Sequence, residues 1–404
     1  MELHPIVAAL RRHRLAVALL VLEIALCCAI LCNLAFMIFA RLSSMQVPSG
    51  IAESELTSLT IGSFRGDNQG AAADAIVQQQ LAALRAIPGV RSADAINSLP
   101  LDRNSWYTEI TFTPDAKDPV ALICEFLATT NAVSTLGLKL VEGRAFTEAD
   151  AAPMDSFLPT APVAILPLAL AHKLWPGEDA LGKTFYMGAH RYQVVGVVEH
   201  LLAPVVHDPA QADFTALFPV AAASDTGGSY VLRAATADRD RVLREAEDVL
   251  LKISPTGIIS DRRHYSEVRA QYFRQDRAMA GLLAGSCLLL LLVTALGIVG
   301  LASFWVQSRT RSIGVRRALG ARRGDILRYF QAENFLIVGV GIGLGMACAY
   351  GLNLWLIERY EIGRLPLLYL PVGALSLWAL GQAATLGPAL RAARVPPVIA
   401  TRSV

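Results

Sequence analysis

Residues 278–308 read AMAGLLAGSCLLLLLVTALGIVGLASFWVQS, a run of 31 residues without a charged side chain. Three further apolar runs cover 15–40, 335–357 and 365–390, and only the first is interrupted by a charge, Glu23. A helix needs about 20 apolar residues to cross the hydrocarbon core of a bilayer. The four runs therefore predict an α-helical membrane protein with four transmembrane helices.

The composition supports this class and excludes others. Hydrophobic residues make up 54% of the 404-residue chain and charged residues 17%, against about 45–50% and about 25% in ordinary soluble domains. A formal net charge of +2 gives no field that would attract nucleic acid, so we expect no nucleic-acid partner. Five of the six cysteines lie in the apolar runs, which leaves Cys124 unpaired and excludes a disulfide framework.

Basic residues near the ends of the apolar runs predict how the chain is oriented across the membrane. Residues 1–14 hold three Arg and one Glu, 307–331 hold seven Arg and one Asp, and the tail after Leu390 holds three Arg and no acid. The segment 41–277 carries 21 basic and 28 acidic residues. Because positive loops stay in the cytoplasm, we expect both termini and 307–331 inside, and 41–277 and the short turn 358–364 outside.

The first run could also be a signal peptide, because it follows Arg11, Arg12 and Arg14. It is longer than the usual apolar region of about 7–15 residues, and its exit offers only a poor small-residue cleavage site. We expect residues 1–41 to form a short cytoplasmic N-terminus and a retained first membrane helix.

The outer segment of 237 residues is long enough for its own core and predicts a mixed α/β domain of two subdomains. The inner subdomain is expected at about 42–123 and 229–263, and a β-rich outer subdomain at about 124–228. A helical stalk at 264–277 would continue into the second membrane helix. Composition and the positions of helix-breaking residues predict helices at 71–87 and 238–253. They also predict strands at 90–99, 106–113 and 191–199, and a strand followed by a short helix at 162–175.

One motif in this segment imitates a nucleotide site. Residues 177–184, Gly-Glu-Asp-Ala-Leu-Gly-Lys-Thr, fit the phosphate-loop pattern. That chemistry needs a strand before the loop and a helix after it, whereas here a helix precedes and a strand follows. We interpret it as a turn before a strand. Neither a Gly-x-Ser-x-Gly motif nor a metal-ligand spacing of His and Cys is present, so we expect no catalytic residues and no metal site.

Small residues recur at helix-packing spacing within the apolar runs. The glycines expected to pack membrane helices are Gly281, Gly285, Gly339, Gly343 and Gly345. Glu23 is an ionisable group deep in a membrane run, where such groups are costly and are functional candidates. A buried polar contact to a neighbouring helix or subunit explains Glu23 equally well.

The segment 307–328, QSRTRSIGVRRALGARRGDILR, closely resembles the cytoplasmic loop of FtsX-like ABC transporter permeases of the MacB type. Residues 137–146, 175–183 and 194–198 are similar to that family's periplasmic domain. The resemblance covers nearly the whole chain and implies a periplasmic domain between helices 1 and 2, with an FtsX-like membrane domain at 278–404. It places the chain in the bacterial inner membrane.

This resemblance implies a transport subunit that couples a separate ABC ATPase to movement of periplasmic substrate. Only 14 residues precede the first run, where fused members carry an ATPase, so ATP and Mg are expected on that partner and not on this chain. A second permease copy or paralogue, a periplasmic adaptor, an outer-membrane channel and lipids are the other expected partners. The residues expected to couple to the ATPase are Ile313, Gly314, Val315, Arg316, Arg317, Leu319, Gly320 and Ala321.

Within this segment we expect a short amphipathic helix in which Ile313 and Val315 form an apolar knob for the ATPase. Ser312 stands where the family usually has Glu, which removes one negative charge from the contact surface. Simple anchoring of the arginines to lipid headgroups is an alternative reading of the same charges. For the whole chain, the alternatives are a regulatory permease that controls a periplasmic hydrolase or senses peptides, and a lipoprotein-releasing permease.

Overall fold

The computed structural model describes residues 14–63, 71–114, 116, 118–155, 158–221, 226, 228–360, 366 and 369–394. Arg11, Arg12, most of the expected outer turn and the tail after Arg394 lie outside these residues. The chain divides into two compact units. We call Met1–Met45 with Gln275–Val404 the helical unit, and Gln46–Arg274 the α/β unit.

The α/β unit contains a four-stranded antiparallel sheet in the order β13-β1-β12-β2. Its strands are β1 (Leu56–Ser63), β2 (Val90–Ala95), β12 (Ser229–Ala234) and β13 (Gly257–His264). Helices α3 (Ala71–Arg85) and α6 (Arg239–Ile253) share with this sheet a core that includes Leu59, Leu81 and Val242. These two helices confirm the expected helices at 71–87 and 238–253.

A second sheet holds seven strands of the described residues, in the order β3-β4-β11-β8-β10-β5, with β9 paired to β10. The strands are β3 (Tyr107–Ile110), β4 (Ala121–Ala128), β5 (Leu140–Gly143), β8 (Val163–Pro167), β9 (Thr184–Met187), β10 (His190–Val198) and β11 (Thr215–Pro219). The pairs β4–β11 and β8–β10 are parallel. Further short elements are α4 (Ala132–Leu136), α5 (Leu168–Leu174), α7 (Tyr265–Tyr272), the β6–β7 pair (Met154–Asp155 and Leu158–Pro159) and the 3-10 helices η1 (Glu148–Asp150) and η2 (Pro209–Gln211).

The subdomain layout differs from the expected one at β3. This strand pairs with β4, with Ile110 opposite Ala121, so it belongs to the seven-stranded sheet and not with the inner subdomain at 42–123. Ile110 is buried in the core of that sheet together with Ile123. The boundary therefore falls before Tyr107, because burial of Ile110 draws the hairpin onto the larger sheet.

The expected continuous stalk is also interrupted. Helix α7 ends at Tyr272 and α8 (Arg274–Ser308) begins two residues later. The backbone N–H of Phe273 donates to the carbonyls of Arg269 and Gln271, which tightens the chain at this point. The Phe273 ring is buried, and the Arg269 guanidinium lies 5.6 Å from its centre. The break therefore has local contacts that hold it.

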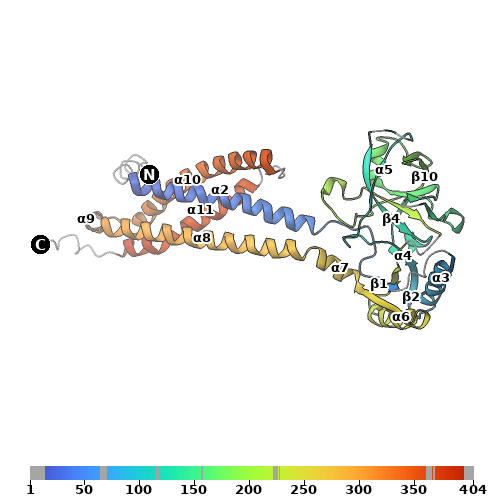
Figure 1. Cartoon of the computed structure of the whole chain (residues 1–404). Helices are drawn as coiled ribbons and strands as arrows, with labels where there is room; N and C mark the ends of the chain where they lie inside the picture. Colours follow the sequence, from blue (N-terminus) through green and yellow to red (C-terminus); the bar gives the residue numbers. More distant parts are fainter. Residues whose placement is uncertain are drawn as a thin grey trace. The chain divides into compact units, whose positions relative to one another are not determined.

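The helical unit consists of α2 (Arg14–Ser44), α8, α9 (Thr310–Ala318), α10 (Arg323–Tyr360) and α11 (Tyr369–Ala393). Helix α2 packs against α10 and α11, and α10 packs against α11 (Figure 1). Their shared core also takes Ile298 and Trp305 from α8. Among the described residues, α2, α8 and Arg323–Trp355 of α10 are long and apolar enough to cross a membrane. Helix α11 is not among them, so four spans remain a prediction.

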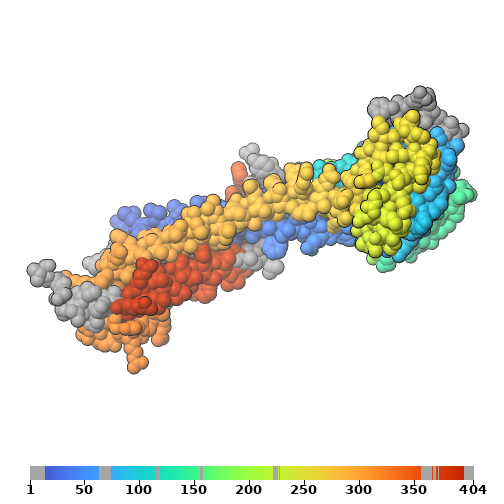
Figure 2. Space-filling view, turned by 90° about the horizontal axis from the view of Figure 1, so that it is seen from below, coloured from blue at the N-terminus to red at the C-terminus, as the bar shows by residue number. Residues whose placement is uncertain are grey.

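Helix α8 is the least covered of these helices. Figure 2 shows it along one face of the helical unit. Leu282, Leu288, Leu289 and Leu296 are all exposed on it. A surface of this kind is stable in lipid and unfavourable in water.

Candidate functional site

Helix α9 is a short helix whose end is fixed by backbone chemistry. Gly320 has a φ of +100°, a left-handed conformation that glycine adopts without steric cost. The N–H of Gly320 donates to the Arg317 carbonyl and the N–H of Ala321 to the Arg316 carbonyl, both at 3.1 Å. These two bonds form a Schellman motif, which ends α9 and turns the chain into α10. The side chain of Asp325 accepts a bond from the Arg322 N–H at the start of α10.

Ile313 fastens α9 to the rest of the helical unit. Its side chain is buried, and Gly314 beside it is buried as well. The cluster around Ile313 draws on α8, α10 and α11 and consists of Val306, Ile326, Phe330, Ala389, Ala392 and Ala393. The expectation that Ile313 forms an outward knob is therefore wrong, since the nearby ends of three helices already cover it.

An ion pair attaches the start of α9 to α10 at a second point. Arg309, the residue before α9, places Nη1 3.0 Å and 2.9 Å from the two carboxylate oxygens of Glu333 on α10. The Glu333 side chain is only 2% exposed. Removing one partner from a buried pair leaves an uncompensated charge, which costs about 3–5 kcal/mol. In addition, the Arg316 guanidinium lies 4.9 Å from the centre of the Tyr329 ring.

The outward side of α9 combines apolar and basic side chains. Val315 is 46% exposed and Leu319 is 82% exposed. Arg311, Arg316, Arg322 and Arg323 are exposed around them, while Arg317 and Ala321 are half-buried. We call Val315 and Leu319 with these four exposed arginines the α9 surface. Of the expected coupling residues, the structure thus turns Val315, Arg316, Leu319 and Gly320 outward and Ile313 and Gly314 inward.

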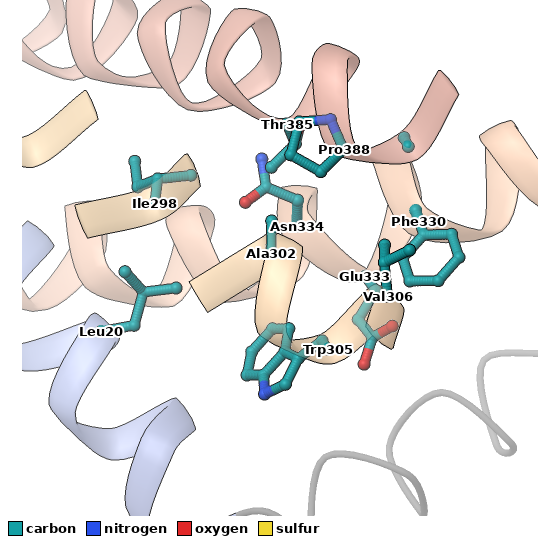
Figure 3. Close-up of a pocket in the computed structure, with 11 residues that line it drawn as sticks. Leu20, Ile298, Ala302, Trp305, Val306, Phe330, Glu333, Asn334, Thr385 and Pro388 are labelled. Atoms are coloured by element: carbon teal, nitrogen blue, oxygen red, sulfur yellow. The ribbon is translucent and has the colours of Figure 1, made fainter. Parts of the chain in front are cut away.

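A narrow cavity is lined in part by Glu333, the partner of Arg309 (Figure 3). Its lining is mostly apolar and comes from α2, α8, α10 and α11: Leu20, Ile298, Ala302, Trp305, Val306, Phe330, Glu333, Asn334, Thr385, Pro388 and Ala389. Asn334 Nδ2 donates to the Gly381 carbonyl at 2.9 Å and so links α10 to α11. The Trp305 indole N–H is buried without a hydrogen-bond partner among the described residues. Packing is therefore incomplete where α9 joins the bundle.

Only one of the expected packing glycines touches a neighbouring helix. A Cβ on Gly345 would lie 2.5 Å from the Cβ of Cys28 and 2.6 Å from the Ala25 carbonyl oxygen, so α10 and α2 are in close contact there. Gly281, Gly285, Gly339 and Gly343 have no such neighbour within 4 Å among the described residues. Within the part of the chain that the structure describes, these four therefore do not pack one membrane helix against another.

Glu23 lies against α8. A Cβ on Gly297 would lie 2.5 Å from Oε1 of Glu23, so the absence of a side chain at Gly297 makes room for this carboxyl group. Gly297 lies within the apolar run at 278–308, and nothing in the neighbouring sequence indicates this contact with Glu23. The half-buried Glu23 carboxyl group thus lies against the backbone of α8, and its role stays a prediction.

Residues 177–184 form the turn that we expected. Gly177 and Gly182 both have φ values near +78° (77° and 78°), and Lys183 forms an ion pair with Glu178. Thr184 opens strand β9, which pairs with β10. No helix follows to present N–H groups to a phosphate. Lys183 is instead neutralised within the turn.

An α/β unit inserted between the first two helices of an apolar helical unit defines a membrane protein with one large domain outside its helices. Two family models match this chain: the MacB-like periplasmic core domain at residues 19–249, more than half of the chain, and the FtsX-like permease C-terminal at residues 285–397. The chain therefore belongs to the MacB-like and FtsX-like family of ABC transporter permeases.

Curated relatives include two export proteins. The macrolide export ATP-binding/permease protein MacB of Rhodospirillum rubrum is 31% identical over 60% of this chain and 38% of its own length. The pyoverdine export ATP-binding/permease protein PvdT of Pseudomonas putida is 30% identical over 65% of this chain and 40% of its own. The ABC transporter permease YvrN of Bacillus subtilis is 27% identical, with 66% of each chain covered. The chain thus spans about two fifths of the length of the export relatives.

Proposed function

We propose that this chain is the permease subunit of an ABC-type export system and that a separate ATPase binds the α9 surface. The observation that carries the proposal is the exposure of Val315 and Leu319 on a helix that is otherwise firmly attached. Exposed apolar side chains on a segment that also exposes four arginines suit a protein contact with a buried centre and a charged rim. Lipid anchoring would need the arginines alone.

The attachments of α9 provide a route for movement. Ile313 joins α9 to α8, α10 and α11 through one cluster, and Arg309 joins it to Glu333 on α10. A displacement of α9 by an ATPase would therefore be carried into three helices at once. In this proposal ATP and Mg are bound by the ATPase, and the motion passes outward to the periplasmic domain to move periplasmic substrate.

The location and further partners belong to the same proposal. The arginines of 307–331 favour a cytoplasmic position for α9, in a bacterial inner membrane with both termini inside. Export is supported by the names of two relatives, a macrolide exporter and a pyoverdine exporter. A second permease copy, a periplasmic adaptor and an outer-membrane channel would complete the assembly.

Retention of the ATPase tests this proposal. A tagged chain is purified from membranes of its own host, and the bound ATPase is measured by photolabelling with an azido-ATP analogue. We expect Val315→Asp and Leu319→Asp each to lower retention at least about tenfold, because truncating or charging a contact centre typically costs 2 kcal/mol or more, about 1.4 kcal/mol being tenfold. Ile313→Asp is unsuitable because it would disrupt the cluster that holds α9.

Ser312→Glu is the matched control. It adds a negative charge to an exposed position of the same helix without removing an apolar side chain. We expect this variant to keep the ATPase at the wild-type level, because Glu is the residue that the resembling family usually has at this position of the contact surface. Equal retention in Val315→Asp, Leu319→Asp and wild type, with normal membrane insertion, would reduce the α9 surface to a lipid anchor and remove the support for coupling.

A further inference from the structure

The α/β unit contains an open polar cleft of about 640 Å³ that the coupling mechanism does not use. It is bordered by the last turn of α3, the start of β2, the beginning of α4 and strand β12. Six residues line it, and we call it the arginine cleft: Arg85, Arg91, Ser92, Asn131, Ser134 and Arg233. Its size falls within the range of about 300–1,000 Å³ typical of small-molecule sites. None of the lining residues is apolar.

Positive charge in the arginine cleft exceeds negative charge. Arg91 Nη1 lies 2.8 Å from Oε1 of Glu55, and Arg233 Nε lies 2.6 Å from Oε2 of the same carboxylate. The hydrogen bond from Arg233, with the charge of Arg91 as a smaller cause, lowers the pKa of Glu55, which therefore stays ionised. The single carboxylate of Glu55 thus forms ion pairs with two guanidinium groups. Arg85 donates instead to a neutral partner, the Ala93 carbonyl, at 2.9 Å.

The nearest buried carboxyl group does not cancel the charge of Arg85. Burial raises the pKa of Asp94 to about 8, against the opposing effects of Arg85 and of the Ala95 N–H. Burial therefore favours the neutral form of Asp94. Three guanidinium groups and the single carboxylate that pairs with two of them, Glu55, leave a net charge of +2 at the arginine cleft, and Arg85 is the lining arginine without an ion pair among the described residues.

The other lining side chains are hydrogen-bonding groups. Ser134 Oγ donates to the Asn131 carbonyl at 2.9 Å, which leaves the oxygen of Ser134 able to accept and the amide of Asn131 exposed. Asn131 is the N-cap residue of α4, yet its side chain makes no capping bond. Guanidinium groups pair with carboxylates and phosphates through two parallel hydrogen bonds, which makes arginine the preferred residue for these anions.

We propose that the arginine cleft binds a small molecule that carries two or more oxyanion groups, either carboxylates or phosphates. Arg85 and Arg91 supply the charge that is open to the ligand, and Arg233 is held in place by Glu55 and by the Ser134 carbonyl at 2.9 Å. Arg91 is the most exposed of the residues in these ion pairs and can leave Glu55 at little cost. This site is independent of the α9 surface, so its test does not depend on an ATPase.

Isothermal titration calorimetry of the full chain in nanodiscs tests the site at low salt and pH 7. Citrate and pyrophosphate are the carboxylate and phosphate probes, and glycerol is the uncharged control. Asn131→Asp is the decisive variant, because it adds a negative charge to the arginine cleft with almost no change of shape and Asp is as good an N-cap as Asn. We expect the affinity for the anion that binds to fall about tenfold, the size of one charge-assisted contact.

Two more variants keep the result unambiguous. Arg91→Gln removes a lining charge and should weaken binding to a similar degree. Arg244→Gln removes an exposed charge on α6, away from the arginine cleft, and should bind like wild type. Binding of either probe with this pattern supports the site, and the anion that binds identifies the oxyanion class. No binding of either probe by wild type, or equal affinity in all four proteins, would overturn it.

Discussion

The two units of this chain use leucine in opposite ways. In the α/β unit Leu166 of β8 is fully buried, as are Phe126, Tyr192 and Phe218. In the helical unit Leu289 of α8 is 63% exposed, with Leu282 and Leu288 exposed beside it. Single exposed leucines occur in both units, but a row of neighbouring exposed leucines such as that on α8 is unfavourable in water and stable in lipid. The comparison indicates that the outer face of α8 is covered by lipid or by another membrane helix.

Buried carboxyl groups in the two units also have different partners. Glu333 in the helical unit is ionically paired with Arg309. Asp94 in the α/β unit accepts a bond from the Ala95 N–H through Oδ1, but its Oδ2 is buried without a partner among the described residues. A paired carboxylate keeps its charge, whereas an unpaired one avoids the cost of burial by taking up a proton.

Matched leucine substitutions test the comparison between the buried leucine of the α/β unit and the exposed leucine of α8. Leu166→Ala should lower the free energy of unfolding of the α/β unit by about 2–5 kcal/mol, because it leaves a cavity in a closed core. Leu289→Ala should change the stability of the helical unit by less than about 0.5 kcal/mol, since little protein packs on that side chain. Thermal unfolding of the full chain in nanodiscs, with hydrogen exchange to assign each transition, measures both effects.

A large loss of stability in Leu289→Ala would contradict this difference. It would mean that the outer face of α8 is a protein interface in the assembled state. Cross-linking of single-cysteine variants at the same face would then distinguish a second permease copy from another partner. A small effect of Leu166→Ala would instead show that the α/β unit is packed more loosely than its burial indicates.

Asp94 gives a prediction about pH. Its pKa is about 8 in the folded chain and about 3.9 when unfolded, so the unfolded state releases its proton first. The stability that this group contributes is complete below about pH 4 and is lost as the pH rises towards 8. We expect unfolding measured from pH 5 to 8 to show a decline on the order of 1 kcal/mol per pH unit in wild type, which Asp94→Asn removes.

Asp150 provides the control for this measurement. The hydrogen bond from Arg144 is the main cause that lowers the pKa of Asp150, so this carboxylate is ionised throughout the range from pH 5 to 8. Asp150→Asn should therefore leave the slope of stability against pH unchanged. Parallel pH profiles for wild type and Asp94→Asn would show that Asp94 is already ionised in the folded chain.

The features that could be predicted from sequence are those set by neighbouring residues. The helix at 71–87 stops where Pro88 and Gly89 follow, and the strand at 191–199 is a short β-branched run, so both were predicted within a few residues. The turn at 177–184 was recognised because its flanks had the wrong order for a phosphate loop. The apolar runs depend only on composition along the chain, and three of the four, at 15–40, 278–308 and 335–357, coincide with helices that are long and apolar enough to cross a membrane.

The features that sequence analysis missed depend on contacts between distant residues. Glu333 lies two residues beyond the arginine-rich segment, and nothing local indicates that it pairs with Arg309. Nine residues of α9 are too few for apolar periodicity to decide which side chain faces inward, so Ile313 was placed on the wrong side. The arginine cleft needs residues from three regions, near 85–92, 131–134 and 233, and has no signature in any of them.

Two glycines on α10 allow a matched test within the helical unit, because within the described part of the chain one contacts α2 and the other does not. Both Gly345→Ala and Gly343→Ala improve helix propensity by the same amount, about 1 kcal/mol, so this contribution cancels between them. A Cβ at position 345 meets Cys28 and Ala25 at about 2.5 Å, whereas one at position 343 has no neighbour within 4 Å among the described residues. We expect Gly345→Ala to be less stable than Gly343→Ala by about 1–3 kcal/mol, because α10 must move away from α2. Thermal unfolding in nanodiscs measures the difference. If Gly343→Ala is as destabilised as Gly345→Ala, the open face of α10 must be packed against a second chain in the membrane, and sedimentation of the two variants would show which of them loses that association.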